Sequence, residues 1–216
     1  MKEYFETDAK CLKLDIAFPY EEMLEEARAL KDRYTEHRGD ESSTGWKSLS
    51  LYGLDEHRHE NWDEYGYATA ADAAKDFKWT QAALDSPVTM NFLLNHFPCE
   101  HYGRVRFMLL EAGGKIDWHN DSNSGIRLAE NINMALNNPV ECIWHWGDGD
   151  QMFMEPGSAY AMNISYDHMI ENNSTEDRYH LIVARHDSTD EWKELIIKSA
   201  DAVNAKGKFI TLNDLP

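Results

Sequence analysis

Residues 140–164 read VECIWHWGDGDQMFMEPGSAYAMNI, and this stretch decides the expected fold. Three short segments rich in apolar and aromatic residues (140–146, 151–154 and 158–164) are separated there by two turn signals. The first turn signal is the run GDGD at 147–150, which is typical of a β-hairpin, and the second is Pro156 followed by Gly157. The stretch therefore predicts short antiparallel strands joined by tight turns.

Segments of the same kind continue on both sides of this stretch. They are RVRFMLLEA (104–112), KIDWH (115–119), NINMAL (131–136), HMIEN (168–172) and RYHLIVAR (178–185). Gly113 and Gly114 are expected to separate the first two of these strands. Eight short strands at this spacing predict an antiparallel barrel or sandwich of the jelly-roll type. The fold class we expect is mainly β with N-terminal helices, as a double-stranded β-helix barrel of the jelly-roll or cupin-like kind.

The chain before residue 100 has a different pattern. Apolar residues at helical spacing predict a helix over 20–38, and an alanine-rich segment predicts another over 68–84. The run GWKSLSLYGL (45–54) is expected to form an early strand. We therefore expect one domain over 1–216. It consists of a mostly helical support region (1–100), a jelly-roll core (101–187) and a C-terminal extension (188–216).

Composition excludes several classes of partner. The chain has 216 residues, with 21 Lys and Arg against 39 Asp and Glu, so its net charge is −18. Binding to nucleic acid or to an anionic membrane surface is not expected, because phosphate groups require clustered cations. The acidic surface instead favours small cationic or zwitterionic substrates. The sequence has no long apolar run, no secretory signal at its start and three unclustered cysteines, so a cytoplasmic location is expected. The oligomeric state is not indicated.

Two histidines and an aspartate are candidate metal ligands. His119 and Asp121 follow a predicted strand at a spacing of two, so both side chains can point the same way, and His168 opens a later strand. Two imidazoles and one carboxylate are the facial triad that holds Fe(II) and leaves coordination positions open. Each residue alone also fits a polar strand end or a core histidine. Asp117 shares the face of His119 by strand alternation, so it is either a rival ligand or a group that supports the ligands from behind.

Arg178 and His180 lie on the last predicted strand and share one of its faces. An arginine inside a barrel is costly unless a carboxylate meets its guanidinium. The neighbouring acids Glu176 and Asp177 are expected to be exposed, so a bound dicarboxylate would supply the missing anion. A surface ion pair at the strand edge is the alternative for Arg178.

Together, His119, Asp121, His168 and Arg178 resemble the pattern of the Fe(II)- and 2-oxoglutarate-dependent oxygenases. Residues 104–187 more narrowly resemble the aspartyl/asparaginyl β-hydroxylase branch, which includes proline cis-hydroxylases. The supporting stretches are YGRVRFMLLEAGGKIDWHND, GIRLAENINMALNNP and DHMIENNSTEDRYHLIVARHD. Some aspartyl hydroxylases of this branch lack the metal-binding carboxylate. Because this chain keeps Asp121, it is more similar to the proline-hydroxylase side and less similar to halogenases.

The resemblance implies a role for each candidate residue. Fe(II) would be held by His119, Asp121 and His168; 2-oxoglutarate by Arg178, His180 and Asn133; and substrate by Arg127, Trp144 and Trp146. Packing is an alternative role for the two tryptophans. The implied reaction uses O2 to hydroxylate an unactivated C–H bond and releases succinate and CO2. Its substrate would be a small amino acid, an amino-acid derivative or a peptide side chain.

Two rival functions use the same fold. One is a non-catalytic cupin-like protein that binds a metal or ligand, and the other is a cupin-type metalloenzyme that does not use 2-oxoglutarate. Neither rival requires a cation ten residues after His168, so Arg178 distinguishes them from the oxygenase.

Arg127 yields the first prediction. If it binds a substrate carboxylate, Arg127→Ala should raise the apparent KM for substrate and uncouple the reaction, because 2-oxoglutarate binding is untouched. Succinate should then still form slowly, without an equivalent amount of hydroxylated product, as measured by mass spectrometry. Unchanged product yield at low substrate concentration would place Arg127 outside the site.

Overall fold

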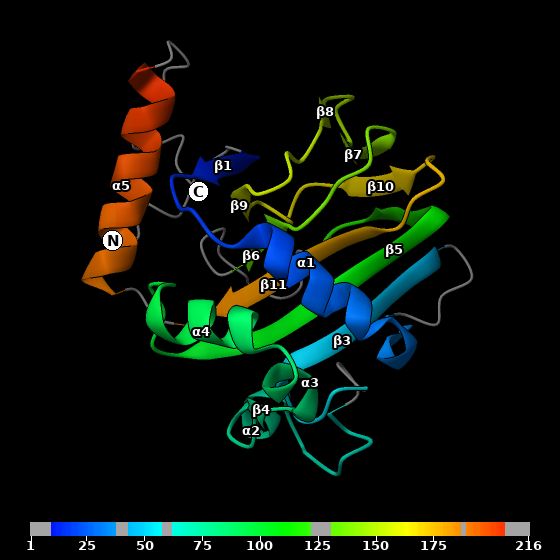
Figure 1. The fold of residues 1–216 in the computed structure, drawn as a ribbon, viewed down its shortest axis with the longest axis vertical. Helices are drawn as coiled ribbons and strands as arrows, with labels where there is room; N and C mark the ends of the chain where they lie inside the picture. The colour runs from blue at the N-terminus through cyan, green and yellow to red at the C-terminus, as the bar shows by residue number, and fades with distance from the viewer. Residues whose placement is uncertain (1–9, 38–42, 58–61, 122–130, 187–188, 206–216) are drawn as a thin grey trace.

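The protein forms one curled sheet with helices packed around it (Figure 1). The computed structural model describes residues 10–37, 43–57, 62–121, 131–186 and 189–205. The strands of the sheet are β1 (Cys11–Leu14), β2 (Thr35–Glu36), β3 (Thr44–Gly53), β4 (Lys78–Trp79), β5 (Tyr102–His119), β6 (Asn131–Ala135), β7 (Cys142–Trp146), β8 (Gln151–Met152), β9 (Ala159–Met162), β10 (His168–Asn172) and β11 (Arg178–Arg185). The main path is β1-β9-β6-β11-β5-β10-β7-β8, and β3 lies beside β5. Each of these pairs is antiparallel, which confirms the jelly-roll prediction.

The strand β5 is longer than the sequence predicted. Two strands separated at Gly113 and Gly114 were expected, but one strand of 18 residues runs through both glycines, so that prediction was wrong. The neighbouring strand explains why. Thr44 pairs with Lys115 and Trp46 with Leu110, so residues 111–114 bulge opposite a single residue of β3. Gly113 has a φ of 72°, which a glycine adopts without strain, and the bulge bends the strand instead of ending it.

Because of the bend, β5 pairs with strands on both walls of the barrel. Residues 102–110 pair with β11 and β3, whereas residues 115–119 pair with β10. The second pairing sets His119 directly opposite His168. Residues that face each other in an antiparallel pair project from the same side of the sheet. The two histidines therefore come together through strand register, although 48 positions separate them in the sequence.

The helices of residues 20–29 and 87–95 lie across one face of the sheet (Figure 1), and the helices predicted over 20–38 and 68–84 are shorter than expected. The described helices are α1 (Tyr20–Ala29), a 3-10 helix (Lys31–Arg33), α2 (Ala70–Ala74), α3 (Gln81–Leu84), α4 (Pro87–Asn95) and α5 (Asp190–Ala205). The helix expected over 20–38 ends at Ala29, and the one expected over 68–84 is interrupted by β4. Both differences have the same cause. The short strands β2 and β4 pair with β3, and this tertiary pairing overrides local helix propensity.

Alternation along the central strands divides the core into two layers. On β5, Phe107 and Leu109 face the helices, whereas Met108 and Leu110 face the inside of the barrel. The inner layer also contains Trp144 from the opposite wall. Among the described helices, none has the length and apolar character required to cross a membrane. The single-domain organisation and the cytoplasmic location stay predictions.

The helix α5 is anchored by one buried aromatic residue. Trp192 is fully buried, and the guanidinium carbon of Arg185 lies 4.0 Å from the centre of its ring. The ring also packs against Phe97 of the helix layer, with the two centroids 6.2 Å apart. A cation over an indole face that is shielded from water is a favourable contact in addition to the apolar burial. Part of the expected C-terminal extension is therefore joined to the core.

Removing this anchor should destabilise the fold. Trp192→Ala should lower the free energy of unfolding by about 3–5 kcal/mol, because it leaves a cavity and uncovers Arg185. Ile197→Ala on the same helix is the matched control, since its side chain is 42% exposed, and it should change stability by no more than about 0.5 kcal/mol. Urea unfolding at constant m measures both variants. Equal midpoints for the two variants would show that α5 does not stabilise the core.

Candidate metal centre and co-substrate pocket

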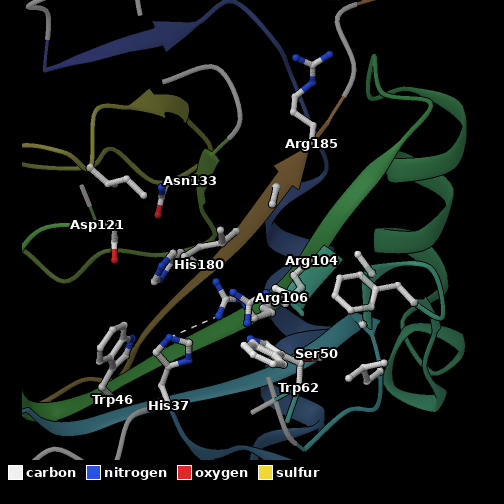
Figure 2. A pocket seen from close by; sticks show the side chains of 18 of the residues that line it. His37, Trp46, Ser50, Trp62, Arg104, Arg106, Asp121, Asn133, His180 and Arg185 are labelled. Atoms are coloured by element: carbon white, nitrogen blue, oxygen red, sulfur yellow. Dashed lines mark hydrogen bonds between the residues drawn. The ribbon is translucent and has the colours of Figure 1, made fainter. Parts of the chain in front are cut away.

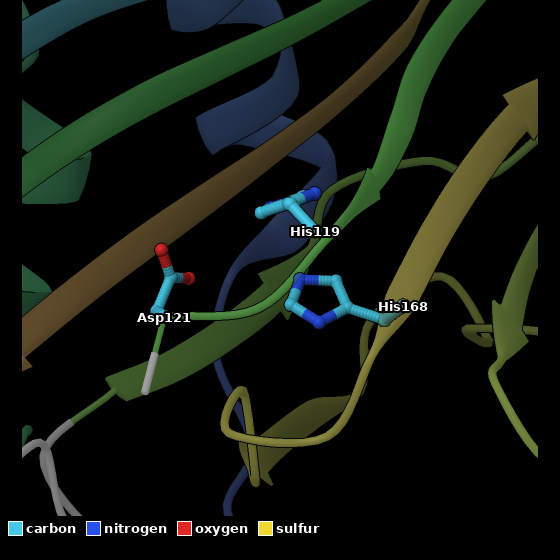
Figure 3. Close-up of side chains that lie close together, drawn as sticks. All are labelled: His119, Asp121 and His168. Atoms are coloured by element: carbon cyan, nitrogen blue, oxygen red, sulfur yellow. The ribbon is translucent and has the colours of Figure 1, made fainter. Parts of the chain in front are cut away.

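The three candidate metal ligands meet at one end of the barrel (Figure 3). His119 ends β5, Asp121 follows it by two residues, and His168 begins β10. One donor atom from each side chain can be chosen so that all three lie within 4.8 Å of one another. The imidazole centroids of the two histidines are 4.3 Å apart. The structure thus brings together the three residues that the sequence predicted as ligands.

Backbone carbonyls orient both imidazoles. The Nδ1 of His119 lies 2.7 Å from the carbonyl oxygen of Asp117, and the Nδ1 of His168 lies 2.8 Å from that of Tyr166. When Nδ1 carries the proton and donates it to the carbonyl, Nε2 keeps its lone pair for a metal. The backbone N–H of Asp121 donates to the carbonyl of Ile164 at 2.9 Å and fixes the third ligand. Two imidazoles and a carboxylate are a donor set that fits Fe(II).

Burial keeps His168 in the form that binds a metal. Its side chain is buried, and the Trp144 ring stacks on it at 4.8 Å between centroids with 14° between planes. Burial, and then the neighbouring His119, lower the pKa of His168 to about 4. The ring is therefore neutral at physiological pH, and a metal does not have to displace a proton from it.

Asp117 is placed differently from the three ligands. Its carboxylate forms an ion pair with Lys115 at 3.2 Å, and its carbonyl holds His119. A hydrogen bond from the Trp118 backbone, together with Lys115, lowers the pKa of this carboxyl group. Asp117 therefore supports the site through its backbone, and its side chain does not join the ligand cluster.

Arg178 is buried in the cavity that contains the metal ligands. This cavity has a volume of about 720 Å³. The guanidinium donates from Nε to the Asn138 side-chain oxygen at 2.9 Å and from Nη2 toward the Met154 sulfur at 3.0 Å. Within the described part of the chain, no carboxylate forms an ion pair with it. Burial lowers the pKa of Arg178, yet an arginine remains charged in proteins, so this charge requires an anion.

His180 lies beside Arg178 on the same face of β11. It is buried and lines the cavity, and its Nδ1 has no hydrogen-bond partner in the described structure. Burial, followed by the charges of Arg178 and Arg106, holds the pKa of His180 well below its ordinary value. A neutral imidazole with an unsatisfied nitrogen next to a buried cation is suited to a polar ligand that fills the cavity.

The remaining candidates have different outcomes. Asn133 is buried on β6 and lines the cavity (Figure 2), as does Trp144 on β7. Trp146 does not line the cavity. It packs against Trp144 with the centroids 5.4 Å apart, because the same inner face of β7 continues past the cavity wall. Arg127 lies outside the described residues.

A buried polar group that the sequence analysis missed adjoins the site. The Nδ1 of His37 lies 3.1 Å from the Ser48 hydroxyl, and its Nε2 lies 3.5 Å from Nη1 of Arg106 (Figure 2). The His37 ring also packs on Trp46, which in turn packs on His119, with centroid distances of 4.2 and 5.9 Å. A sequence signal for Arg106 existed. The run RVR at 104–106 places two arginines on one face of a strand that is otherwise apolar.

The cavity has the opposite charge to the molecule as a whole. Four arginines contribute to its lining, Arg104, Arg106, Arg178 and Arg185, against the single carboxylate of Asp121 among the described residues. The expectation from the acidic surface, a cationic or zwitterionic substrate, considered only the net charge of −18. Local charges act at shorter range and with less screening than the distant surface, so the cavity itself favours anionic ligands.

The sequence over residues 15–188 matches the model of a protein family described as aspartyl/asparaginyl beta-hydroxylase. This match covers far more than half of the chain. The chain belongs to the aspartyl/asparaginyl β-hydroxylase family. Membership supports the general reaction class expected from the sequence, hydroxylation. A search of curated proteins finds no match to this family member.

Solved structures that resemble this β-hydroxylase family member are similar only at low identity. A prolyl-4-hydroxylase from Pseudomonas putida has 15% identity and a TM-score of 0.44, over 84% of this chain and 95% of that one. The non-heme α-ketoglutarate-dependent epimerase SnoN from nogalamycin biosynthesis has 16% identity and a TM-score of 0.47, over 84% and 79%. A 2OG-Fe(II) oxygenase family protein from Burkholderia pseudomallei has 14% identity and a TM-score of 0.45, over 77% and 81%. The family assignment therefore depends on the sequence match.

The geometry of the ligand cluster yields a prediction about metal binding. His119→Ala or His168→Ala should abolish Fe(II) binding while the protein stays folded, because each removes one of three donors. Asp121→Ala should weaken binding strongly. Asp117→Ala is the matched control: it keeps the carbonyl that holds His119, so binding should persist. Anaerobic calorimetric titration with Fe(II) measures the affinity, and circular dichroism reports the fold. A folded His168→Ala protein with wild-type affinity would contradict the assignment.

Proposed function

We propose that this protein is an Fe(II)- and 2-oxoglutarate-dependent dioxygenase that hydroxylates an unactivated C–H bond of a small amino acid, an amino-acid derivative or a peptide side chain. Succinate and CO2 would be the co-products. The main support for this proposal is the buried guanidinium of Arg178. It lies in the same cavity as the three candidate metal ligands and forms no ion pair with a described carboxylate.

Each proposed ligand has a place in the cavity. His119, Asp121 and His168 would hold iron, which supplies, when bound, the site for activating O2 and the keto acid. Arg178 would bind the distal carboxylate of 2-oxoglutarate, since a planar guanidinium fork matches a carboxylate. Asn138 holds that fork in place through Nε and leaves other donors of the guanidinium for the co-substrate.

His180 and Asn133 would complete the co-substrate pocket. Both are buried, both line the cavity, and they lie on the neighbouring strands β11 and β6. The unsatisfied Nδ1 of His180 and the side-chain amide of Asn133 offer hydrogen bonds to carboxylate oxygens. Trp144 stacks on His168, and an aromatic ring at this place would restrict the access of water to the metal side, which favours productive oxygen chemistry.

The charge of the lining supports a substrate that carries a carboxylate. Arg106 lies in the cavity wall and contacts His37, which itself packs on Trp46 beside the metal ligand His119. Arg127, in the part of the chain that the structure does not describe, is the other candidate for this carboxylate. Two rival functions are a cupin-like binding protein and a cupin metalloenzyme that does not use 2-oxoglutarate. Neither of them requires the buried charge of Arg178.

Substitution of Arg178 tests the proposal. Removing one partner of a desolvated charge pair costs about 2–5 kcal/mol, which corresponds to at least about thirtyfold in affinity. Arg178→Met keeps much of the side-chain bulk, so Fe(II) binding should survive while 2-oxoglutarate affinity falls by at least that factor. Arg178→Lys should recover only part of the loss, because an ammonium group cannot reproduce the fork.

The measurement is an anaerobic titration with 2-oxoglutarate, by calorimetry or by absorbance of the iron complex, on the wild type and both variants. Succinate formation under air provides an independent readout. An Arg178→Met protein that binds Fe(II) and has unaltered 2-oxoglutarate affinity would overturn the co-substrate role. The cupin-like binding function would then be the better explanation of the fold.

A further inference from the structure

The cavity extends beyond the metal ligands and the co-substrate pocket. Its far part, which we call the outer chamber, is lined by Trp62, Tyr65, Ala70, Ala71, Ala74 and Phe77. These residues come from the segment that follows β3 and from helix α2 and the turn after it. In Figure 2, Trp62 lies on the side of the cavity opposite Asp121, with Arg106 between them. Because all of these residues line one cavity, the outer chamber is continuous with the proposed site, on the side away from Asp121.

The outer chamber is apolar, and small side chains keep it open. On α2, Ala74 follows Ala70 by four positions and Ala71 by three, so the three side chains lie on one side of the helix. This side lines the cavity. Aromatic rings supply much of the remaining wall. Apolar walls with a few polar groups are typical of pockets that bind the apolar part of a small molecule. Any of these alanines, if replaced by a large residue, would fill space that is now open.

Two arginines, Arg104 and Arg106, lie between the outer chamber and the part of the cavity that contains the metal ligands. Arg104 and Arg106 are two positions apart on β5, so both side chains project from the cavity-facing side of the strand. Leu110, four positions from Arg106, is the register partner of Arg178. At a rise of about 3.3 Å per residue, Arg106 lies roughly 13 Å along the strand from the co-substrate cation. The two cationic positions are therefore separate and can serve two different anionic groups.

The volume of the cavity exceeds the requirement of a free amino acid. If each non-hydrogen atom is given the roughly 30 Å³ of a liquid water molecule, the ten atoms of 2-oxoglutarate occupy about 300 Å³. The eight atoms of a free amino acid such as proline occupy about 240 Å³ on the same generous scale. The cavity measures about 720 Å³, so space remains after both are placed. We assign this remaining space to the outer chamber.

We propose that the substrate is a carboxylic acid that carries an apolar group, such as an N-acylated amino acid, and that the outer chamber binds this group. This inference rests on the proposed function and narrows its substrate class. The carboxylate would lie toward Arg104 and Arg106, the apolar group would fill the space beside α2, and the C–H bond to be oxidised would face the metal ligands. A free amino acid would leave the outer chamber filled with water and would bind weakly.

N-acylglycines of increasing chain length test the proposal, because they combine a carboxylate with a variable apolar group. Burial of one methylene is worth about a fourfold gain in affinity. Anaerobic calorimetry of the full chain, with Fe(II) and 2-oxoglutarate present, should show at least a tenfold gain from N-acetylglycine to N-hexanoylglycine. Hexanamide, which keeps an apolar chain and lacks the carboxylate, should bind at least tenfold more weakly than N-hexanoylglycine.

Two variants locate the apolar group. Ala71→Phe places a large ring in the outer chamber, and because Ala71 is exposed as well as lining the cavity, the variant should fold. Its affinity should no longer rise with chain length. Ala68→Phe is the matched control, since Ala68 is exposed in the same segment but does not line the cavity, and it should keep the wild-type rise.

The outcomes separate this inference from the proposed function. The outer-chamber proposal would be overturned if the affinity of the wild type for N-acylglycines did not rise with acyl chain length. It would also be overturned if this affinity rose equally in Ala71→Phe. Equal binding of hexanamide and N-hexanoylglycine would overturn the assignment of the carboxylate. Failure of the protein to bind 2-oxoglutarate would overturn the proposed function, whereas the chain-length series without co-substrate would still report on the outer chamber.

Discussion

The antiparallel pairing of one bent strand with three neighbours sets the geometry of the barrel and of its site. Strand β5 pairs with β3 and β11 through residues 102–110 and with β10 through residues 115–119. One half therefore carries Arg104 and Arg106 of the cavity lining, and the other half carries the metal-ligand candidate His119. The bulge opposite Gly45 sets the relation between the two halves, and the pairing of His119 with His168 follows from it.

The second organising feature is a cationic cavity inside an acidic molecule. The net charge of −18 arises mainly from side chains that water can solvate at little cost. Buried arginines cannot be solvated in this way, and their desolvation is compensated only by fixed hydrogen bonds or by an anion. Asn138 and Met154 hold the guanidinium of Arg178 without neutralising it. A ligand that brings a carboxylate would therefore stabilise the cavity as well as bind to it.

The site also depends on groups that have no direct role in chemistry. The carbonyl groups of Asp117 and Tyr166 select the imidazole tautomers, and each precedes its histidine by two residues. Trp46 connects His119 with His37 and so links the metal side of the cavity to the position of Arg106. A change at His37 would thus affect the electrostatics of the cavity through contacts, without touching a metal.

The jelly-roll class could be predicted from the sequence alone, because turn residues and the two-residue period of strands are local properties. The same two-residue period indicated that His119 and Asp121 point the same way and that the polar residues of the last strand share one face. The pairing of distant segments, in contrast, makes β5 one strand, ends α1 at Ala29, packs Trp146 behind the cavity wall and brings His37 to Arg106. These features depend on strand register between segments far apart in the chain, and local propensity carries no information about such contacts.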